Sequence, residues 1–230
     1  MNSLIVIPAL NEESSIQSVI EKLRKENLNN ILVVNDFSTD NTAQIVQSNN
    51  VDLINLPLQL GAWGATQTGI RYALEKGFDF VITMDADGQH ISKGILALKK
   101  HIAKTEANVV IGTFTKRLSR SKRVAWWFFK TLTHLKIEDL TSGFRIYDRK
   151  AIKILSSSAA SLLDYQDVGV LLLLTKSGMK ISETEVPMTT RENGKSKIFY
   201  SWWMVLKYMV QTTMICIAKT RVYNIRKVNK

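Results

Sequence analysis

The alternation of apolar runs and amphipathic stretches in the N-terminal half predicts buried strands separated by helices. Short runs rich in apolar and β-branched residues have the length of strands, at 3–8, 30–34, 51–56 and 80–84. Helices are expected at 12–26 and at 65–76, and a further helix ends near residue 46 after the cap candidates Ser38, Asp40 and Asn41. This alternation predicts an α/β domain with a mostly parallel sheet that is flanked by helices.

The second half is less regular but continues the same pattern. Strands are expected at 109–111 and 180–186, and helices at 122–135, 164–177 and 199–218, with a polar loop at 189–197. No repeat or linker interrupts the chain, so we expect one domain over 1–197. Residues 198–230 would add an apolar helix and a basic tail to that domain.

The C-terminal apolar stretch is almost long enough to span a bilayer. A spanning helix needs about 20 mainly apolar residues, and a lysine at its centre costs about 3 kcal/mol. Lys207 and Gln211 lie near the middle of 201–218. We therefore expect an amphipathic helix that lies at the membrane surface or packs on protein.

The formal net charge is +11, and the positions of the basic residues indicate a membrane surface as a candidate partner. A basic cluster at 116–123 runs into the aromatic stretch 126–129, and the apolar C-terminal stretch is followed by a basic tail. Basic groups beside Trp and Phe suit an anionic membrane surface. A solvated basic face beside core aromatics is the competing interpretation, and nucleic-acid binding is the least favoured, so we expect no nucleic-acid partner.

Two further features indicate a compartment. Cys216 is the single cysteine and cannot form an internal disulfide, and no secretory signal pattern opens the sequence. We expect a cytoplasmic protein that is bound peripherally to the inner face of the membrane. A membrane-protein partner is left open.

The sharpest chemical feature is the segment Asp85-Ala86-Asp87-Gly88-Gln89, directly after the predicted strand 80–84. Two carboxylates two residues apart at a strand end can hold one hard cation, and Gln89 adds a neutral oxygen at the same spacing. Such a partly open oxygen site suits Mg²⁺ or Mn²⁺ carrying a diphosphate. The competing interpretation is an ordinary Asp-rich turn in which Asp87 caps the next element.

Two more polar turns follow predicted strands, at 8–13 and 35–40. The carboxylate of Asp36 can accept hydrogen bonds from a nucleobase or a ribose, whereas Asp40 is expected to cap the next helix. Because ligands bind where the carboxyl ends of parallel strands emerge, we expect all three turns at one edge of the sheet.

These three turns, together with Thr141-Ser142-Gly143-Phe144-Arg145, resemble glycosyltransferase family 2, whose fold is called GT-A. The resemblance runs over about 3–197 and is greatest to the polyprenyl-phosphate branch, typified by dolichol-phosphate mannosyltransferases. It implies a Rossmann-like fold and inverting transfer of a sugar from a nucleotide donor.

The resemblance also implies roles for individual residues. Pro8, Leu10 and Glu12 match the turn that holds the base of the donor, and Asp36 matches the acid on its nucleoside. Asp85, Ala86, Asp87 and Gln89 match the segment that binds metal and diphosphate. Arg191, Gly194, Lys195, Ser196 and Lys197 look like a mobile loop that closes over phosphates. Arg145 looks like part of the wall near the transferred sugar or the acceptor; an ion pair with Asp139 or Asp148 is the alternative.

The sequence departs from the family pattern at three positions, which bear on the substrate more than on the fold. Asn35 stands where the first acid of an Asp-Asp pair is usual, and Phe114 stands where the lipid-phosphate branch has arginine. Gly169 occupies a position where many members have glutamate, while Asp167 is present nearby.

The function expected from these residues is transfer of a hexose from a GDP- or UDP-sugar to a polyprenyl phosphate. Arg117, Arg120 and Arg123, with Lys195 and Ser196, would hold the acceptor phosphate, and Asp87 and Arg145 would act at the reaction centre. A saccharide acceptor is the alternative, and it needs a general base, for which Asp167 is the candidate and Asp164 the reserve. A non-catalytic nucleotide-sugar-binding subunit is the alternative from another class.

Overall fold

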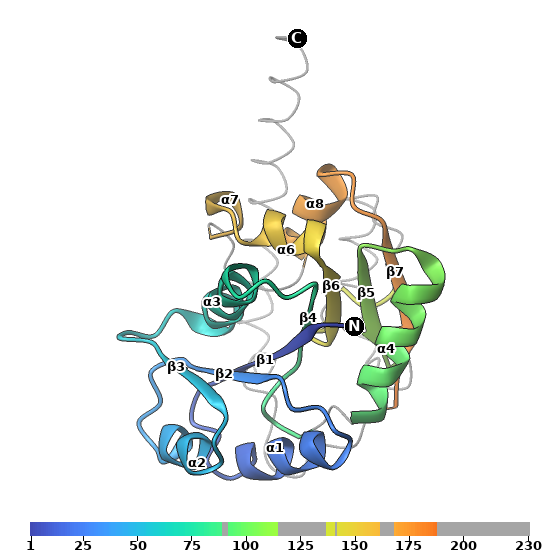
Figure 1. Cartoon of the computed structure of the whole chain (residues 1–230). Coiled ribbons are helices and arrows are strands. Elements are labelled where there is room, and N and C mark those ends of the chain that lie inside the picture. The colour runs from blue at the N-terminus through green and yellow to red at the C-terminus, as the bar shows by residue number, and fades with distance from the viewer. Residues whose placement is uncertain (89–91, 115–136, 141, 162–167, 188–230) are drawn as a thin grey trace, which may run out of the picture.

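The structure is a computed structural model that describes residues 1–88, 92–114, 137–140, 142–161 and 168–187 (Figure 1). Within these residues, seven strands form one sheet in the order β3-β2-β1-β4-β6-β5-β7. The strands are β1 (Ser3–Ala9), β2 (Ile31–Asn35), β3 (Asp52–Asn55), β4 (Phe80–Thr83), β5 (Val109–Thr113), β6 (Arg145–Asp148) and β7 (Ile181–Glu185). The helices are α1 (Ile16–Lys25), α2 (Thr42–Ser48), α3 (Gly61–Glu75), α4 (Ser92–Thr105), α6 (Arg149–Leu155), α7 (Ser158–Ser161) and α8 (Val168–Lys176).

The sheet is mixed but mostly parallel, as the sequence predicts. β6 runs antiparallel to both of its neighbours, β4 and β5, and every other pairing in the sheet is parallel. The carboxyl ends of β1, β2, β3, β4, β5 and β7 therefore meet at one edge. β6 begins at that same edge, so the residues that precede it also arrive there.

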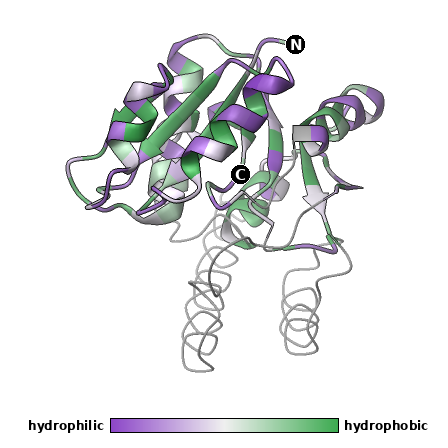
Figure 2. Ribbon diagram, turned by 90° about the horizontal axis from the view of Figure 1, so that it is seen from below, coloured by the Kyte–Doolittle hydropathy of each residue, from purple (hydrophilic) through white to green (hydrophobic). Residues whose placement is uncertain are grey.

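Helices cover both faces of the sheet (Figure 1). One core packs α1, α2 and α4 against the sheet and includes Ile16, Val46 and Ile95. The other packs α3, α6, α7 and α8 on the opposite face and includes Trp63 and Leu155. The strands β1, β2, β4 and β5 are predominantly apolar and the helices carry both kinds of residue (Figure 2), which is the pattern expected when helices shield both faces of a sheet.

Several predicted boundaries differ from the observed ones. The first helix begins at Ile16 and not at residue 12, because the turn before it is occupied by hydrogen bonds to another loop. α3 begins at Gly61, four residues before the predicted start, and its first turn buries Trp63. The sequence interpretation assigned no element to the regions of α4, β6, α6 and α7.

The predicted helices at 122–135 and 199–218 lie outside the described residues. Across the described part of the chain, no helix combines the length and the apolar character that a membrane crossing requires.

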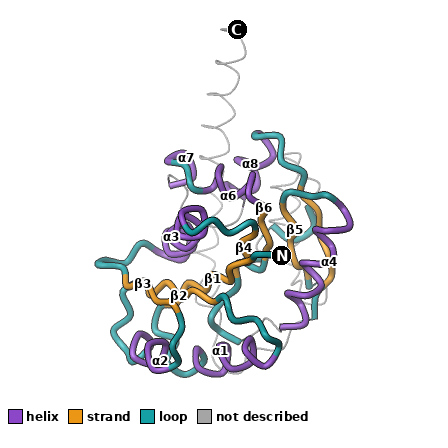
Figure 3. Tube along the Cα trace, viewed as in Figure 1, coloured by secondary structure: helices purple, strands orange, loops and turns teal. Residues whose placement is uncertain are grey.

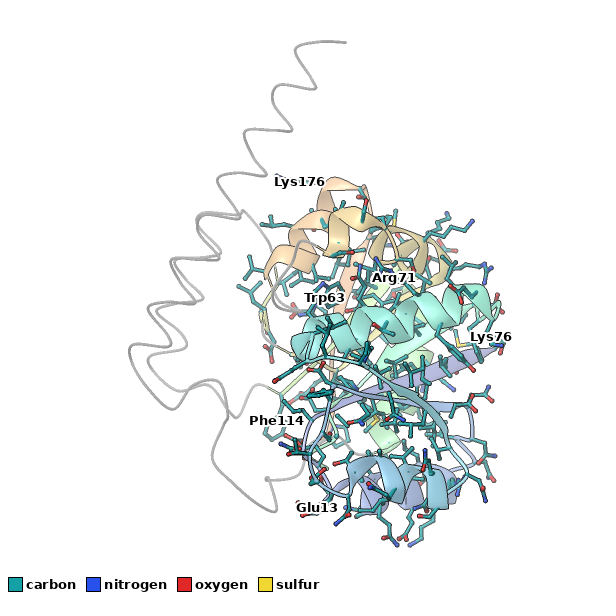
Figure 4. The ribbon with its side chains drawn as sticks, turned by 90° about the vertical axis from the view of Figure 1, so that its left-hand side faces the viewer. Glu13, Trp63, Arg71, Lys76, Phe114 and Lys176 are labelled. Carbon is teal, nitrogen blue, oxygen red and sulfur yellow. The ribbon has the colours of Figure 1, made fainter. Side chains whose placement is uncertain are left out.

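One face of α3 is fastened to the α6–α7 segment by side chains four residues apart. Trp63 Nε1 donates to the carbonyl of Ala160 at 2.8 Å, and Gln67 Nε2 donates to the carbonyl of Leu155 at 2.9 Å. Arg71 Nε donates to the carbonyl of Ser156 at 3.2 Å. Figure 4 shows Trp63 and Arg71 on α3 facing this segment. The bonds of Gln67 and Arg71 satisfy carbonyls at the end of α6 that have no partner inside the helix, and the bond of Trp63 reaches α7.

Candidate functional site

The carboxyl edge of the sheet brings together the turns that the sequence singled out. Ala9 pairs with Asn35, and Asn35 pairs with Asn55, so the turns after β1, β2 and β3 leave side by side. Thr83, at the end of β4, pairs with Arg145, which in turn pairs with Ile111 of β5. Figure 3 shows the loops that leave the strands, and Figure 4 places Glu13 and Phe114 at the opposite end of the molecule from Lys76. The predicted convergence of the polar turns is confirmed.

The turns after β1 and β2 are laced together by side chain–backbone hydrogen bonds. The backbone N–H groups of Asn11 and Glu12 donate to Ser38 Oγ at 3.0 Å and to Thr42 Oγ1 at 2.8 Å. In the reverse direction, the N–H of Thr39 donates to Asn11 Oδ1 at 2.9 Å. These bonds hold the segment Pro8–Glu12 against the turn of Asp36, so both are ordered before any ligand binds.

Left-handed backbone conformations shape both of these turns. Asn11 has φ +54° and Phe37 has φ +65°, a conformation that asparagine adopts more readily than most non-glycine residues and that is strained for phenylalanine. Strain of this kind persists where the surrounding contacts impose it, and it gathers at binding sites. The lacing bonds supply those contacts here.

Asp40 accepts the first N–H of α2, as the sequence predicts for a capping acid, although the N-cap position itself is Asn41. Oδ1 of Asp40 accepts the backbone N–H of Thr42 at 3.0 Å, and its Oδ2 accepts that of Glu13 at 3.1 Å. Burial acts to raise the pKa of Asp40, but the hydrogen bonds from Thr42 and Glu13 together outweigh it and lower the pKa. The carboxylate is therefore committed to joining the two turns.

Asn35 keeps the hydrogen bonding of this turn without the charge of an acid. It is 6% exposed, and its Nδ2 donates to Asn55 Oδ1 at 2.8 Å. Its Oδ1 accepts the N–H of Ser38 at 3.1 Å. An acid at this position would have no N–H to offer Asn55, so Asn35 and Asn55 form a matched pair that joins β2 to β3.

Asp36 is buried and held at one oxygen. The side chain is 2% exposed, and its Oδ1 accepts the backbone N–H of Leu60, at the start of α3, at 2.7 Å. This bond joins the turn after β2 to the helix that follows β3. Leu60 was not among the predicted site residues, because a backbone donor leaves no trace in the residue type.

The turn after β4 presents two carboxylates at the edge of the sheet. Ala86 is buried while Asp85 is exposed and Asp87 is half-exposed, so the two acids flank a buried anchor. Gly88 has φ +73° and ends the turn. In the described part of the chain no group of three His, Cys, Asp or Glu side chains is placed to hold a metal. Two carboxylates in one turn fit a hard cation whose other ligands come from phosphates and water.

The turn before β6 is fixed by Ser142 and Phe144. Ser142 Oγ donates to the carbonyl of Gly112 at 2.7 Å, and the N–H of Ser142 donates to Asp139 Oδ1 at 3.0 Å. The ring of Phe144 lies between two glycines: a Cβ at Gly112 would come within 2.7 Å of the ring, and one at Gly94 within 2.8 Å. Both positions therefore require glycine for this packing.

Arg145 lies in the interior, beneath the edge that the sequence expected it to line. It is 0% exposed, and its Nη2 donates to the carbonyl of Leu140 at 3.1 Å. Within the described residues, its Nε and Nη1 have no hydrogen-bond partner. The proposed alternative partner Asp148 instead caps α6 through Ala151 and accepts a hydrogen bond from Asn108.

Glu183 of β7 fastens the loop that leads into this turn. Its two carboxylate oxygens accept the backbone N–H groups of Glu138 at 2.8 Å and of Asp139 at 2.9 Å. Burial raises the pKa of Glu183, the negative charges of Glu138 and Asp139 add to the rise, and the two hydrogen bonds oppose it. Sequence patterning gave no sign of this contact, which joins residues distant in the chain.

The raised pKa of Glu183 predicts a pH dependence of stability. A carboxyl whose pKa is higher in the folded state contributes stability below its unfolded pKa and loses it as the pH rises through the folded value. Substitution Glu183→Gln removes this titration, so the variant should gain stability relative to the native chain as the pH rises from about 4. Urea unfolding at a series of pH values measures the difference, and a difference that is constant with pH would contradict the assignment.

Part of the predicted site lies outside the described residues. This applies to Gln89 of the metal segment, to the cations Arg117, Arg120, Arg123, Arg191, Lys195 and Lys197, to Ser196, and to the acids Asp164 and Asp167. Pro8, Leu10, Glu12, Asp36, Asp85, Ala86, Asp87 and Arg145 are all at or beneath the one edge.

Comparison with known proteins agrees with this arrangement. The sequence profile of glycosyl transferase family 2 matches residues 4–155. UDP-N-acetylglucosamine–dolichyl-phosphate N-acetylglucosaminyltransferase of Methanococcus voltae is 30% identical over 213 residues, which cover 81% of this chain and 84% of that protein. Undecaprenyl-phosphate mannosyltransferase of Micrococcus luteus is 28% identical over 217 residues, which cover 86% of this chain and 88% of that protein.

A solved structure shares the fold. Glucosyl-3-phosphoglycerate synthase from Mycobacterium tuberculosis, solved in complex with uridine diphosphate, superposes with a TM-score of 0.73 at 18% identity. The match covers 94% of this chain and 80% of that one. The predicted GT-A architecture is confirmed by this likeness. The family match, which spans the laced turns and the Asp85–Asp87 turn, shows that this chain belongs to glycosyltransferase family 2 and is a glycosyltransferase.

Proposed function

We propose that this protein moves a hexose from a nucleotide sugar to a polyprenyl phosphate, with inversion and with Mg²⁺ or Mn²⁺ bound at Asp85 and Asp87. The observation that carries the proposal is the meeting of two sites at one edge of the sheet. The laced turns with Asp36 offer a nucleoside site, and the Asp85–Asp87 turn offers a site for a cation with a diphosphate. A nucleotide sugar needs both at once.

The names of the relatives support the acceptor. The Methanococcus voltae protein is named for transfer to dolichyl phosphate, and the Micrococcus luteus protein for transfer to undecaprenyl phosphate. A lipid phosphate is already anionic, so it needs cations to hold it and no strong general base. Arg117, Arg120 and Arg123, with Lys195 and Ser196, are proposed to hold this phosphate, and Arg191 and Lys197 to close over the diphosphate of the donor.

Catalysis in this scheme is mainly positioning. The laced turns fix the nucleoside and the carboxylates fix the diphosphate, so the anomeric carbon is held for attack from the opposite side. A bound divalent cation would neutralise the charge that develops on the departing diphosphate. Arg145 is buried beneath the edge that carries both sites. Its bond to the carbonyl of Leu140 supports the loop before β6.

A lipid acceptor also requires contact with a membrane. We propose peripheral association with the cytoplasmic face, through the basic cluster at 116–123 and the segment 198–230. Basic and aromatic residues together favour an anionic bilayer surface. A membrane-protein partner is compatible with this arrangement.

Transfer to vesicles tests the proposal. Purified protein is incubated with Mg²⁺ or Mn²⁺ and a panel of labelled UDP- and GDP-sugars, with anionic vesicles that contain polyprenyl phosphate. We expect a labelled lipid that disappears when a chelator is added, and protein that sediments with the vesicles. A product formed only on added saccharide would move the acceptor to a sugar and bring Asp167 forward as the base. Donor binding without any product would favour a non-catalytic subunit.

A further inference from the structure

Glu183 and Arg145 hold one short segment of the chain, residues 138–140, at its two ends. The two carboxylate oxygens of Glu183 accept the backbone N–H groups of the first two residues of the segment, at 2.8 and 2.9 Å. At the other end, Nη2 of Arg145 donates to the carbonyl of Leu140 at 3.1 Å. The anion therefore binds backbone donors and the cation binds a backbone acceptor, and charge-assisted bonds of this kind are stronger than bonds between neutral groups.

The sheet sets the spacing of these two side chains. Arg145 pairs with Ile111 of β5, and Ile111 pairs with Glu183 of β7, so the three residues form one row across three adjacent strands. Residues in one row project on the same face of a sheet, and strands on either side of a third are about 10 Å apart. Because residues 138–140 bond to both outer members of the row, the segment crosses this face from β7 to β6.

Stability does not explain either charge. Arg145 is 0% exposed, and within the described residues its Nε and Nη1 have no hydrogen-bond partner. Burial raises the pKa of Glu183, so its charged form is also held at a cost near neutral pH. Apolar side chains in place of buried charges often leave a protein as stable as before or make it more stable. Proteins break such rules chiefly at functional sites.

The segment 138–140 leads into a turn that contacts the end of β4. The N–H of Ser142 donates to Asp139 Oδ1 at 3.0 Å, which joins the turn to the segment. Thr83 Oγ1 donates to the carbonyl of Gly143 at 2.7 Å, which joins the turn to β4. Thr83 stands two residues before the Asp85–Asp87 turn. The position of the segment therefore sets where Ser142 and Gly143 lie beside the carboxylates.

The order of the strands places this turn on the acceptor side of the proposed site. In a nucleotide sugar the diphosphate lies between the nucleoside and the sugar. The proposed nucleoside site follows β1 and β2, and the proposed diphosphate site follows β4. The next strand in the sheet is β6, with β5 and β7 beyond it. The transferred sugar and the acceptor therefore belong over β6 and β5.

We propose that Glu183 and Arg145 are positioning residues for the acceptor: together they form a clamp on residues 138–140 that holds the turn of Ser142 and Gly143 where the acceptor meets the sugar. This inference rests on the proposed function and adds two residues that act through the backbone of a loop. The laced turns and the two carboxylates hold the donor by contacts of their own. Loosening the clamp should therefore impair use of the acceptor and spare binding of the donor.

The variant Glu183→Gln loosens one end of the clamp. Its amide oxygen can accept one backbone N–H, but its N–H₂ group then faces the other. Rates are measured at saturating donor with polyprenyl phosphate in detergent micelles, so that membrane association does not enter. We expect kcat/KM for the acceptor to fall by at least about tenfold, since small misplacements cost rate steeply. The Kd values of UDP and GDP with Mn²⁺, from calorimetry, should be unchanged.

Ile20→Val is the control for a loss of stability alone. Ile20 is fully buried in α1, on the face of the sheet that is covered by α1, α2 and α4, and removal of one methylene group there destabilises the core mildly. The acceptor kinetics and the Kd values of the two nucleotides should both remain those of the native chain.

The variant Arg145→Met gives a second readout at the other end of the clamp. Methionine fills much of the same space without a charge, so the midpoint of urea unfolding should stay at or above that of the native chain. We expect kcat/KM for the acceptor to fall by at least about tenfold in this variant as well. A lower unfolding midpoint would show that the guanidinium serves stability and would remove Arg145 from the clamp.

The outcomes separate this inference from the proposed function. An unchanged kcat/KM for the acceptor in Glu183→Gln would overturn the clamp, and so would an equal loss of donor binding, while the transferase would stand. If the native chain transfers no sugar to polyprenyl phosphate from any donor, the proposed function fails and the inference fails with it.

Discussion

Substitution Asp87→Asn is expected to reduce sugar transfer by about 10²–10³-fold, the range found when one group that stabilises developing charge is removed from an active site. The amide keeps the shape of the side chain but removes the charge that holds a cation against the diphosphate. Asp87 is half-exposed in the turn after β4, so the free energy of unfolding should change by no more than about 0.5 kcal/mol. Initial rates at saturating donor and metal give the activity, and urea unfolding gives the stability.

Asp79→Asn is the matched control for this variant. Asp79 is exposed and precedes β4 at the opposite edge of the sheet, so the same chemical change falls at the other end of this strand, away from the site. It should leave transfer unchanged. Equal activity in the two variants would remove Asp87 from the metal site and return it to the role of a turn residue.

Substitution Gly69→Ala is expected to have the largest effect on stability. A Cβ at Gly69 would overlap the methyl groups of Val6, which is fully buried in β1, the strand at the centre of one core. Overpacking of this kind costs about 1–3 kcal/mol, and the higher helix propensity of alanine offsets at most about 1 kcal/mol of it. Urea unfolding should show a lower midpoint with an unchanged slope.

A double-mutant cycle isolates the cause. Val6→Ala alone leaves a cavity and destabilises the chain, but in combination with Gly69→Ala it makes room for the added methyl group. The loss of unfolding free energy in the double variant should therefore be smaller than the sum of the losses in the two single variants. Additive effects would show that the loss comes from elsewhere in α3.

The fold was predictable as far as local patterns reach. The strands of the first half were located within a few residues, because each is a short apolar run between turn residues. β6 was not predicted, because its four residues include Arg145 and Asp148 and carry no apolar run. The helix α4 was also missed, although its apolar positions Ile95, Leu98 and Ile102 have helical spacing.

The candidate site was likewise predicted only in part. Asp85, Asp87 and Asp36 were found because an acid after a strand is visible in the sequence. The contacts that fix the site were not predicted. Leu60 donates through its backbone N–H, and Glu183 accepts from a loop 44 residues away in the chain. The spacing of Trp63, Gln67 and Arg71 on one helix face was a detectable signal for the contact with α6 and α7.

The antiparallel strand β6 has a consequence for how the chain folds as it is synthesised. β1, β2, β3 and β4 pair among themselves and are contiguous in sequence with α1, α2 and α3, so this half needs only local crossovers. β5 reaches the rest of the sheet through β6, which lies between it and β4. The second half therefore cannot dock until residue 148 has left the ribosome, and until then β4 is an open edge. Long-range pairings of this kind form late and leave such an edge exposed to other chains.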